Sequence, residues 1–449
     1  MHGQSGGRGR SVLSRPGFVL GLVLLAQIAI AEEPSPPAIP SPLSLPQALE
    51  LFERRGFALL LADAAVRSAE GDAEIAAAFP NPAIAGGAGH TWSYDPNRCA
   101  SAGCSNTPWG GALTDQGLVA DLLIGKRRLR ADVAEAALRA ARLQRDDAVR
   151  SLGALLEEQW VQAVVAGALV RTAEQAAAAS AQTAQLVDLR WRAGDVSEAD
   201  AAIAETAKLQ AEQGVDAARQ QLAETKASLA FLLGERSGTP AFELPAELPD
   251  CVPPPELRDA TSDDLLARAR ERRPDVAAAK AQLESAQSGL SLAERARIPD
   301  IGLTASYQRE GTGNEALTPP TAVFGVTVPL PLFYRGQGEV TKAEANLRAQ
   351  QIASDKVDAQ IASEVAQSYA AWQSARSRLD RMQSRMLERS RRALDLVDYQ
   401  YKRGAASLLE LLDAQRTWVA TQANYEQNVG DWWISLYQLQ AATGETPKT

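Results

Sequence analysis

Several residue types on which enzymes and metal proteins depend are scarce in this chain of 449 residues. It has two histidines and three cysteines, and aromatic residues make up 5% of it. His2 lies in a segment interpreted below as a signal peptide, so a mature chain would keep one histidine, His90. A single histidine disfavours a Ser-His-Asp triad and a histidine-rich metal site. We therefore predict that the chain is not an enzyme and needs neither a metal nor a cofactor.

The chain also lacks a nucleotide-binding loop, a long apolar run and an excess of basic charge. No G-x-x-x-x-G-K-[ST] motif occurs, so the energy for any pumping would come from a partner protein. Beyond residue 31, no apolar run reaches the length of about 18 residues that is typical of a transmembrane helix. The formal net charge of −9 argues against nucleic acid as a partner.

Residues 1–31 have the features of a secretory signal peptide. Three arginines precede an apolar stretch, which is too short to span a bilayer, and Ala29-Ile30-Ala31 is a small-x-small cleavage signal. We predict export and cleavage before Glu32; the alternative is a short membrane anchor. Because residue 32 is a glutamate, no lipidated cysteine is expected at the mature N-terminus.

Two of the three cysteines lie close together in a proline-bounded loop. Cys99 and Cys104 are five residues apart, and export would bring them into an oxidising compartment. A loop-closing disulfide and two free thiols are both compatible with this spacing. Cys251 stands alone in a proline-rich linker and receives no functional interpretation.

The placement of proline divides the chain into two similar parts. All 24 prolines avoid the windows 109–239 and 332–446, where very long helices could therefore run. Matching features recur at a nearly constant spacing: Gly125 and Gly336 are 211 residues apart, and Gly194 and Gly404 are 210 apart. The motifs Glu135-Ala-Ala-Leu and Glu344-Ala-Asn-Leu are 209 apart. We infer a tandem duplication, with repeats at 32–239 and 262–449 and a linker at 240–261.

Each repeat is predicted to follow the same plan. A helix that ends at Pro80 or Pro299 leads into two extended stretches, a very long helix, a glycine turn and a returning helix. The strands of the second repeat alternate apolar and polar residues, whereas those of the first repeat are located mainly by the duplication. The predicted strands are 82–95, 113–124, 300–309 and 321–331, and the predicted long helices are 125–192, 196–233, 336–402 and 407–442.

These elements predict a mainly α fold with a small β part. A helix of about 65–70 residues is on the order of 100 Å long, so it has to pack along its length against antiparallel neighbours as in a coiled coil. Four strands cannot close a barrel, because membrane-spanning barrels need at least about eight. Open sheet edges are not tolerated in lipid, so strands that cross a membrane require several chains to share one barrel.

The doubled pattern of helix, two strands, long helix, glycine turn and helix resembles the TolC family of outer-membrane efflux proteins. The segment Val328-Pro-Leu-Pro-Leu-Phe-Tyr-Arg-Gly-Gln-Gly338 is similar to the heavy-metal, CzcC-like branch of that family. The resemblance implies a homotrimer with a twelve-stranded barrel in the outer membrane and a helical tunnel through the periplasm. It also implies a periplasmic adaptor protein and an inner-membrane RND-type pump as partners.

Acidic residues follow both glycine turns. The resemblance places Gly194 and Gly404 at the periplasmic tip, where acids narrow the aperture of TolC-like channels. Glu410 and Asp413 match that position, and Asp200 corresponds to Glu410 through the repeat. Carboxylates repeated around a narrow ring would concentrate cations, whereas the alternative is ordinary solvated helix charge.

The sequence therefore predicts a passive export duct of a tripartite efflux system, with heavy-metal cations as the favoured cargo. Two alternatives remain open at this stage. One is a drug or general-substrate duct of the same family, and the other is a structural coiled-coil protein of the cell envelope.

Overall fold

The computed structural model describes most of the chain that follows the predicted signal peptide. All helices and strands in the described part of the chain belong to one unit, Pro40–Thr449. Cys99 and Cys104 lie outside the described residues, so the predicted disulfide stays a prediction. The described residues are 39–90, 92, 107–115, 117–236, 241–258, 260–309 and 321–447.

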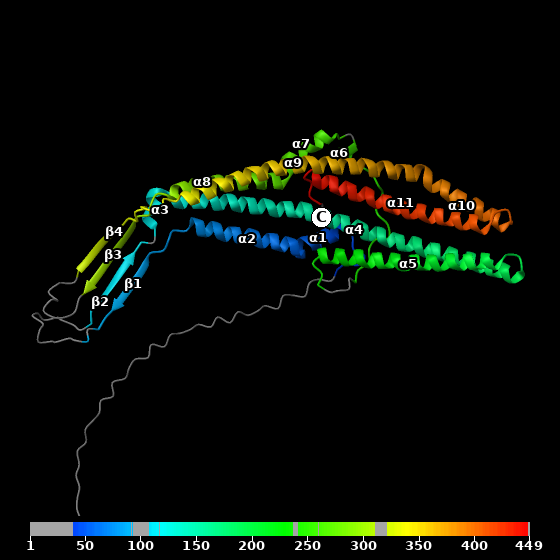
Figure 1. The fold of residues 1–449 in the computed structure, drawn as a ribbon, viewed down its shortest axis with the longest axis horizontal. Coiled ribbons are helices and arrows are strands. Elements are labelled where there is room, and N and C mark those ends of the chain that lie inside the picture. The colour runs from blue at the N-terminus through cyan, green and yellow to red at the C-terminus, as the bar shows by residue number, and fades with distance from the viewer. Residues whose placement is uncertain are drawn as a thin grey trace, which may run out of the picture. The chain divides into compact units, whose positions relative to one another are not determined.

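The two repeats supply similar elements in the same order (Figure 1). The first repeat contains α1 (Leu45–Arg55), α2 (Phe57–Ala77), β1 (Ala83–Ala88), β2 (Trp109–Thr114), α3 (Leu118–Ile124), α4 (Lys126–Ala193) and α5 (Glu198–Leu232). The linker carries the short α6 (Pro255–Arg258). The second repeat contains α7 (Ser262–Arg272), α8 (Pro274–Ala296), β3 (Gly302–Arg309), β4 (Thr321–Thr327), α9 (Gln337–Arg381), the π-helical segment η2 (Met382–Met386), α10 (Leu387–Lys402) and α11 (Leu408–Ala442).

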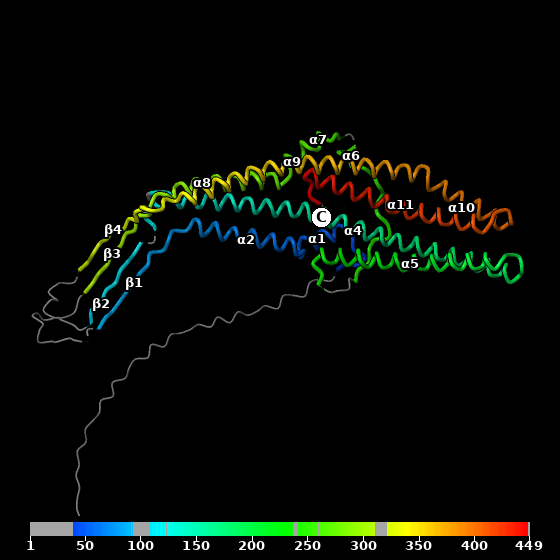
Figure 2. The backbone as a smooth tube through the Cα atoms, viewed as in Figure 1, coloured from blue at the N-terminus to red at the C-terminus, as the bar shows by residue number. Residues whose placement is uncertain are grey.

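The central helix of the fold is α4, which runs for 68 residues without a proline. It begins after Gly125 and ends before Gly194, and both glycines adopt the left-handed conformation that most other residues avoid. α4 packs against α2, α5, α8 and α11, and α9 packs against α8 and α11. Each repeat thus forms an antiparallel helical hairpin, α4–α5 or α9/α10–α11 (Figure 2). None of the described helices is both long and apolar enough to cross a membrane.

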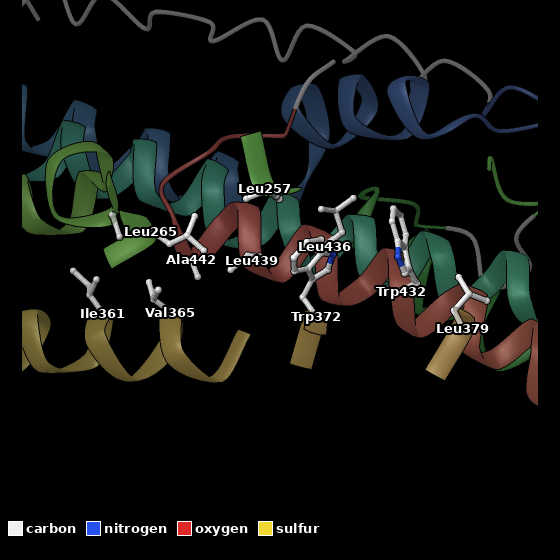
Figure 3. Close-up of a cluster of buried hydrophobic side chains, with 11 residues drawn as sticks. Leu257, Leu265, Ile361, Val365, Trp372, Leu379, Trp432, Leu436, Leu439 and Ala442 are labelled. Atoms are coloured by element: carbon white, nitrogen blue, oxygen red, sulfur yellow. The ribbon is translucent and has the colours of Figure 1, made fainter. Parts of the chain in front are cut away.

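A cluster of buried hydrophobic side chains in the second repeat lies between α9 and α11 (Figure 3). Trp372 and Trp432 are both almost fully buried there, and Leu257 of α6 and Leu265 of α7 close the cluster. Burying an aromatic or aliphatic side chain of this size stabilises the fold by roughly 1.5–3 kcal/mol. The cluster therefore holds the linker against the hairpin of the second repeat.

Four antiparallel strands form one sheet in the order β1-β2-β3-β4. β1 and β2 come from the first repeat, and β3 and β4 from the second, so the central β2–β3 pairing joins the two repeats. Its register places Leu113 opposite Ala305 and Trp109 opposite Arg309. β1 and β4 are the edge strands.

In both repeats, an aromatic side chain of the long helix forms a hydrogen bond with the chain just before a short helix. Trp160 of α4 donates its indole N–H to the carbonyl of Leu43, and Tyr369 of α9 donates its hydroxyl to the carbonyl of Ala260. Each acceptor directly precedes the N-cap of a short helix, Ser44 or Thr261. These paired contacts show that the duplication extends to individual hydrogen bonds.

Two arginines play equivalent roles at the ends of the returning helices. Arg55 donates to the carbonyl of Leu233, just after α5, and Arg273 donates to the carbonyl of Ala442 at the end of α11. Cations at a helix C-terminus satisfy free carbonyls and interact favourably with the helix dipole. Arg273 is buried and also pairs with Asp275 and Glu364.

One predicted strand is wrong. The sequence predicted a strand over 113–124, but the strand β2 ends at Thr114 and the helix α3 begins at Leu118. The Asp115 carboxylate accepts hydrogen bonds from the backbone N–H groups of Gly117, Leu118 and Val119, which starts the helix. A short apolar run such as this one fits a strand or a helix equally well by periodicity alone.

The second long helix also differs from its predicted form. The prediction was one helix over 336–402, whereas η2 interrupts α-helical geometry at Met382–Met386. The short helices divide as well: α1 and α2 meet at Gly56, and α7 and α8 meet at Arg273 with Pro274 following. Proline and glycine disfavour a continuous helix at these points.

Candidate functional site

The two hairpin turns have the same backbone geometry. Gly194 and Gly404 follow the long helices with φ of +84° and +76°. In both turns the next backbone N–H reaches back to a helix carbonyl: Asp195 donates to Arg190 at 2.8 Å, and Ala405 donates to Gln400 at 2.9 Å. This is the Schellman pattern, which ends a helix with its last carbonyls satisfied.

The predicted acids have a local structural role in these turns. Ser407 is the N-cap of α11, and its backbone N–H and hydroxyl donate to the Glu410 carboxylate at 2.7 and 2.9 Å. Ser197 makes the same capping box with Asp200 at the start of α5. The hydrogen bonds from the Ser407 backbone and side chain hold the pKa of Glu410 below its ordinary value.

The sequence reasoning singled out the acids and missed the two serines. The signal was present, because Ser-x-x-Glu and Ser-x-x-Asp after a turn are typical of a capping box. Asp413, one turn beyond Glu410 on α11, is exposed. Asp200 is half-buried, and Glu410 is exposed.

A hydrophobic cluster holds the two hairpin tips together. Val187 of α4 and Ala204 of α5 pack with Tyr401 of α10 and with Leu408 and Leu411 of α11. The Arg190 guanidinium also lies 5.0 Å from the centre of the Tyr401 ring, a cation–π contact. Asp200 and Glu410 therefore lie at the same end of the paired hairpins, each bonded to the serine of its own turn.

The four-stranded sheet presents one apolar face. Its register aligns Ile84, Leu113, Ala305 and Phe324 in a row across all four strands. Ile84 is 85% exposed and Phe324 is 84% exposed. Residues that alternate with them belong to the opposite face, where Ala112, Ser306 and Gly325 are small or polar and Val323 is apolar. The sheet is thus two-sided, with its large apolar side chains facing away from any core of the described chain.

The segment that joins β4 to α9 contains most of the motif at Val328–Gly338. Leu330, Leu332 and Phe333 are exposed in this connection. The Tyr334 hydroxyl donates to the Glu339 carboxylate at 2.5 Å and accepts from the backbone N–H of Gly338 at 2.9 Å. These bonds fold the motif back onto the first turn of α9.

Comparison with known proteins connects these features. A profile of the outer membrane efflux protein family matches residues 49–235 and again residues 265–445. The cobalt-zinc-cadmium resistance protein CzcC of Cupriavidus metallidurans is 25% identical over 391 residues, which cover 86% of this chain and 86% of that protein. The pyoverdine export outer membrane protein OpmQ of Pseudomonas aeruginosa is 30% identical over 266 residues, which cover 58% of this chain and 53% of that protein.

A solved structure has the same fold. The crystal structure of the outer membrane protein VceC from Vibrio cholerae matches with a TM-score of 0.71 at 21% identity, over 89% of this chain and 96% of that one. The predicted fold class, long antiparallel helices with four strands in a duplicated chain, is confirmed. A family of efflux channels also agrees with the prediction that the chain is not an enzyme. Because the family profile matches both halves, this chain belongs to the outer membrane efflux protein family.

Proposed function

We propose that the chain is one subunit of a passive duct through which a partner pump exports its cargo from the periplasm across the outer membrane. The observation that carries this proposal is the sheet: it exposes an apolar row on one face and ends in two unpaired edge strands, β1 and β4. In a bilayer both features are satisfied when the edges pair with other chains and the apolar face meets lipid. The predicted signal peptide supplies the route of export.

Three copies would then close one barrel. β4 of one chain pairs with β1 of the next, and three chains give the twelve strands that the family resemblance implies. The long hairpins would extend from this barrel into the periplasm and present their tips to an adaptor protein and an RND-type pump. A homotrimer in detergent is the expected assembly, whereas a stable monomer that keeps its strand signal would contradict the barrel.

The apolar face can be tested on a single strand. Phe324→Asp places a carboxylate on the lipid-facing side of β4, where a charge is unfavourable, although an acidic side chain costs less than the roughly 2–4 kcal/mol of a basic one near the middle of the membrane. Val323→Asp, on the opposite face of the same strand, is the matched control. We expect the Phe324 variant to be lost from outer-membrane trimers and the Val323 variant to remain. Equal recovery of both variants would overturn the assignment of the faces.

The tip acids are proposed to form the cation-selective constriction. Glu410 and Asp413 would contribute six carboxylates in a trimer, and Asp200 would add to the field from the neighbouring hairpin. Their common position at the hairpin ends supports this role. Like charges crowded into a narrow aperture concentrate cations and repel anions.

The constriction is tested with variants that remove charge but keep the helix cap. Glutamine can replace glutamate in a capping box, so Glu410→Gln with Asp413→Asn should leave the turn folded. In a planar bilayer under a salt gradient, we expect the reversal potential of this double variant to move toward zero and block by divalent cations to weaken. Ser407→Ala is the control, since it weakens the cap and keeps the charge. Unchanged selectivity in the double variant would place the constriction elsewhere.

Heavy-metal cations are the proposed cargo. The motif at Val328–Gly338 and the relationship to a cobalt-zinc-cadmium resistance protein over 86% of the chain favour metals. The relationship to a pyoverdine export protein makes a siderophore or drug duct the alternative. Deletion of the gene in its host should lower tolerance to cobalt, zinc or cadmium salts and leave tolerance to hydrophobic antibiotics unchanged. The reverse pattern would identify the duct as one for organic cargo.

A further inference from the structure

A cavity of about 260 Å³ lies away from both the tips and the sheet. It is lined by residues of α4, α11, the start of α1, the proline-rich linker and the C-terminal tail. The lining contains two carboxylates, Glu157 and Glu445, and two large aromatic rings, Trp433 and Tyr437. Among the lining residues that the structure describes, none is a lysine, arginine or histidine.

Glu157 is the unusual member of this lining. Its residue is only 7% exposed, and its carboxylate oxygens, which no described residue bonds, are not among the fully enclosed atoms of the described chain. The adjacent Glu158 differs, because it accepts hydrogen bonds from Gln162 and Gln438. Arg150, on the same helix, is already occupied by Asp147 and by the carbonyl of Ala441. Partial loss of water around a carboxylate disfavours its charged form, and this desolvation raises the pKa of Glu157 to about 8.

The other repeat shows that the helical framework does not require this carboxylate. Ala366 lies 209 residues after Glu157, in the register that also relates Trp160 to Tyr369. Ala366 is exposed on α9. In the first repeat, the linker and the C-terminal tail cover the equivalent position, with Val252, Pro254 and Pro447 in the lining. The buried acid therefore belongs to the cavity and not to the packing of the long helix.

The aromatic rings are held in place around the cavity. The centres of the Trp433 and Tyr437 rings are 5.5 Å apart, and their planes are inclined by 32°. Trp433 donates its indole N–H to the carbonyl of Pro249, which fixes the ring against the linker. Aromatic faces attract cations, and the attraction strengthens where water is excluded.

We propose that this cavity binds a compact organic ammonium ion. The ion would pair with the carboxylate of Glu157 and rest against the faces of Trp433 and Tyr437, with Glu445 adding a second negative charge at the C-terminal tail. The cavity, with a volume of about 260 Å³, is large enough for an ion of the size of tetramethylammonium. A hard metal ion fits less well, because the lining is largely apolar and aromatic and such ions prefer several oxygen ligands. In the described part of the chain, no group of three or more His, Cys, Asp and Glu residues is placed to hold a metal.

Titration calorimetry of the full chain in detergent tests the proposal, with tetramethylammonium chloride as the probe and sodium chloride as the reference. This probe keeps its charge at every pH. Because the carboxylate has to be ionised to attract it, binding should be about 30-fold weaker at pH 6.5 than at pH 9, as expected for a pKa of about 8. Protons should be released on binding near neutral pH, which two buffers of different ionisation enthalpy would reveal.

Two pairs of variants distinguish binding in this cavity from nonspecific attraction of the cation to the acidic protein. Glu157→Gln should weaken binding at pH 9 at least tenfold, whereas Glu158→Gln, one residue away, should leave it unchanged. Tyr437→Leu should weaken binding about fivefold through the lost ring face, while Tyr437→Phe keeps it. Circular dichroism checks that each variant is folded.

Three results would overturn the proposal: absence of binding at pH 9, equal binding by the Glu157→Gln variant, or preference for a divalent cation over tetramethylammonium. The measurement uses purified protein and does not depend on transport. It can therefore fail while the duct function stands, and the reverse also holds.

Discussion

The long helices of the two repeats differ in one turn, and the difference shows where the fold tolerates change. α4 is continuous over 68 residues, whereas its counterpart is divided by the π-helical η2. Trp160 and Tyr369 are 209 residues apart, but Leu186-Val187-Asp188 and Leu396-Val397-Asp398 are 210 apart. A π-turn accommodates one extra residue in a helix, so η2 absorbs this insertion. The additional residue is thus taken up in the middle of the helix, before the turn at the tip.

The tips, by contrast, are nearly identical in the two repeats. Each has a left-handed glycine, a serine cap and an acid three residues after the serine. Each long helix also ends with an ion pair one turn apart, Asp188–Arg192 or Asp398–Lys402. Local geometry is thus kept where two hairpins have to end at the same level.

The largest effect is expected from deleting one residue in each long helix. Deletion of Ser384 removes the extra residue of η2 and should convert it into ordinary α-helix with little loss of stability. α4 contains no π-helical turn that could compensate for the deletion of Ala178. This deletion rotates the rest of the helix by about 100° and turns Val187 away from the cluster at the tips. We expect folded protein from the first variant and little or none from the second. Similar melting temperatures for both would refute the role given to η2.

The glycines after the helices give the next largest effects, in a defined order. A Cβ at Gly234 would overlap the carbonyl oxygen of Arg55, and one at Gly444 would lie 2.9 Å from the Cβ of Arg272. Gly404 has a similar left-handed φ but open space around it. Alanine should therefore cost about 3 kcal/mol at Gly234, somewhat less at Gly444 and about 1 kcal/mol at Gly404. Thermal unfolding monitored by circular dichroism measures the loss of stability in each variant. An equal loss at all three sites would show that the left-handed φ, and not the steric overlap, determines the cost.

A smaller, pH-dependent effect is expected at Glu157. Its folded pKa of about 8 lies above the ordinary value of 4.5, so the folded state favours the protonated form. The stability linked to that form is fully present below about pH 4.5 and is lost as the pH rises through 8. Glu157→Gln should therefore be more stable than the natural chain at pH 9 and similar to it at pH 5.

The other repeat supplies the control for that measurement. Ala366→Glu puts a carboxylate at the matching but exposed position of α9, where no comparable pH dependence should arise. A pH-dependent loss of similar size in this variant would mean that the long helix, and not the cavity, disfavours the charge.

The smallest effects are expected at the serine caps, and they should be equal. Ser197→Ala and Ser407→Ala each remove one side-chain cap and should each cost about 1 kcal/mol. Since the two sites lie on different helices, the double variant should lose the sum. A clearly unequal loss would show that the two tips are not energetically equivalent.

The sequence predicted the helices well because proline and glycine mark their ends over long, unambiguous windows. It failed at Leu118–Ile124, where seven residues are too few to distinguish a helix from a strand and the sequence did not reveal the hydrogen bonds that Asp115 accepts from the start of the helix. At the tips it found the acids but not the serines that bind them. The cavity at Glu157 could not be predicted from the sequence, because residues far apart in the chain, such as Val252 and Pro447, line it together with Glu157.

The pairing of β2 with β3 has a consequence for the ancestry of the chain. The β2–β3 pairing joins the two repeats in the same antiparallel way in which β4 would pair with β1 of a neighbouring subunit. An ancestor of half the length would have carried one two-stranded hairpin with both edges free, and a ring of twelve strands would have required six copies of it. Fusion of two genes would then have replaced every second subunit boundary by a covalent link. The halves became free to diverge, so an extra residue in one long helix and a buried acid beside the other could each arise on a single side.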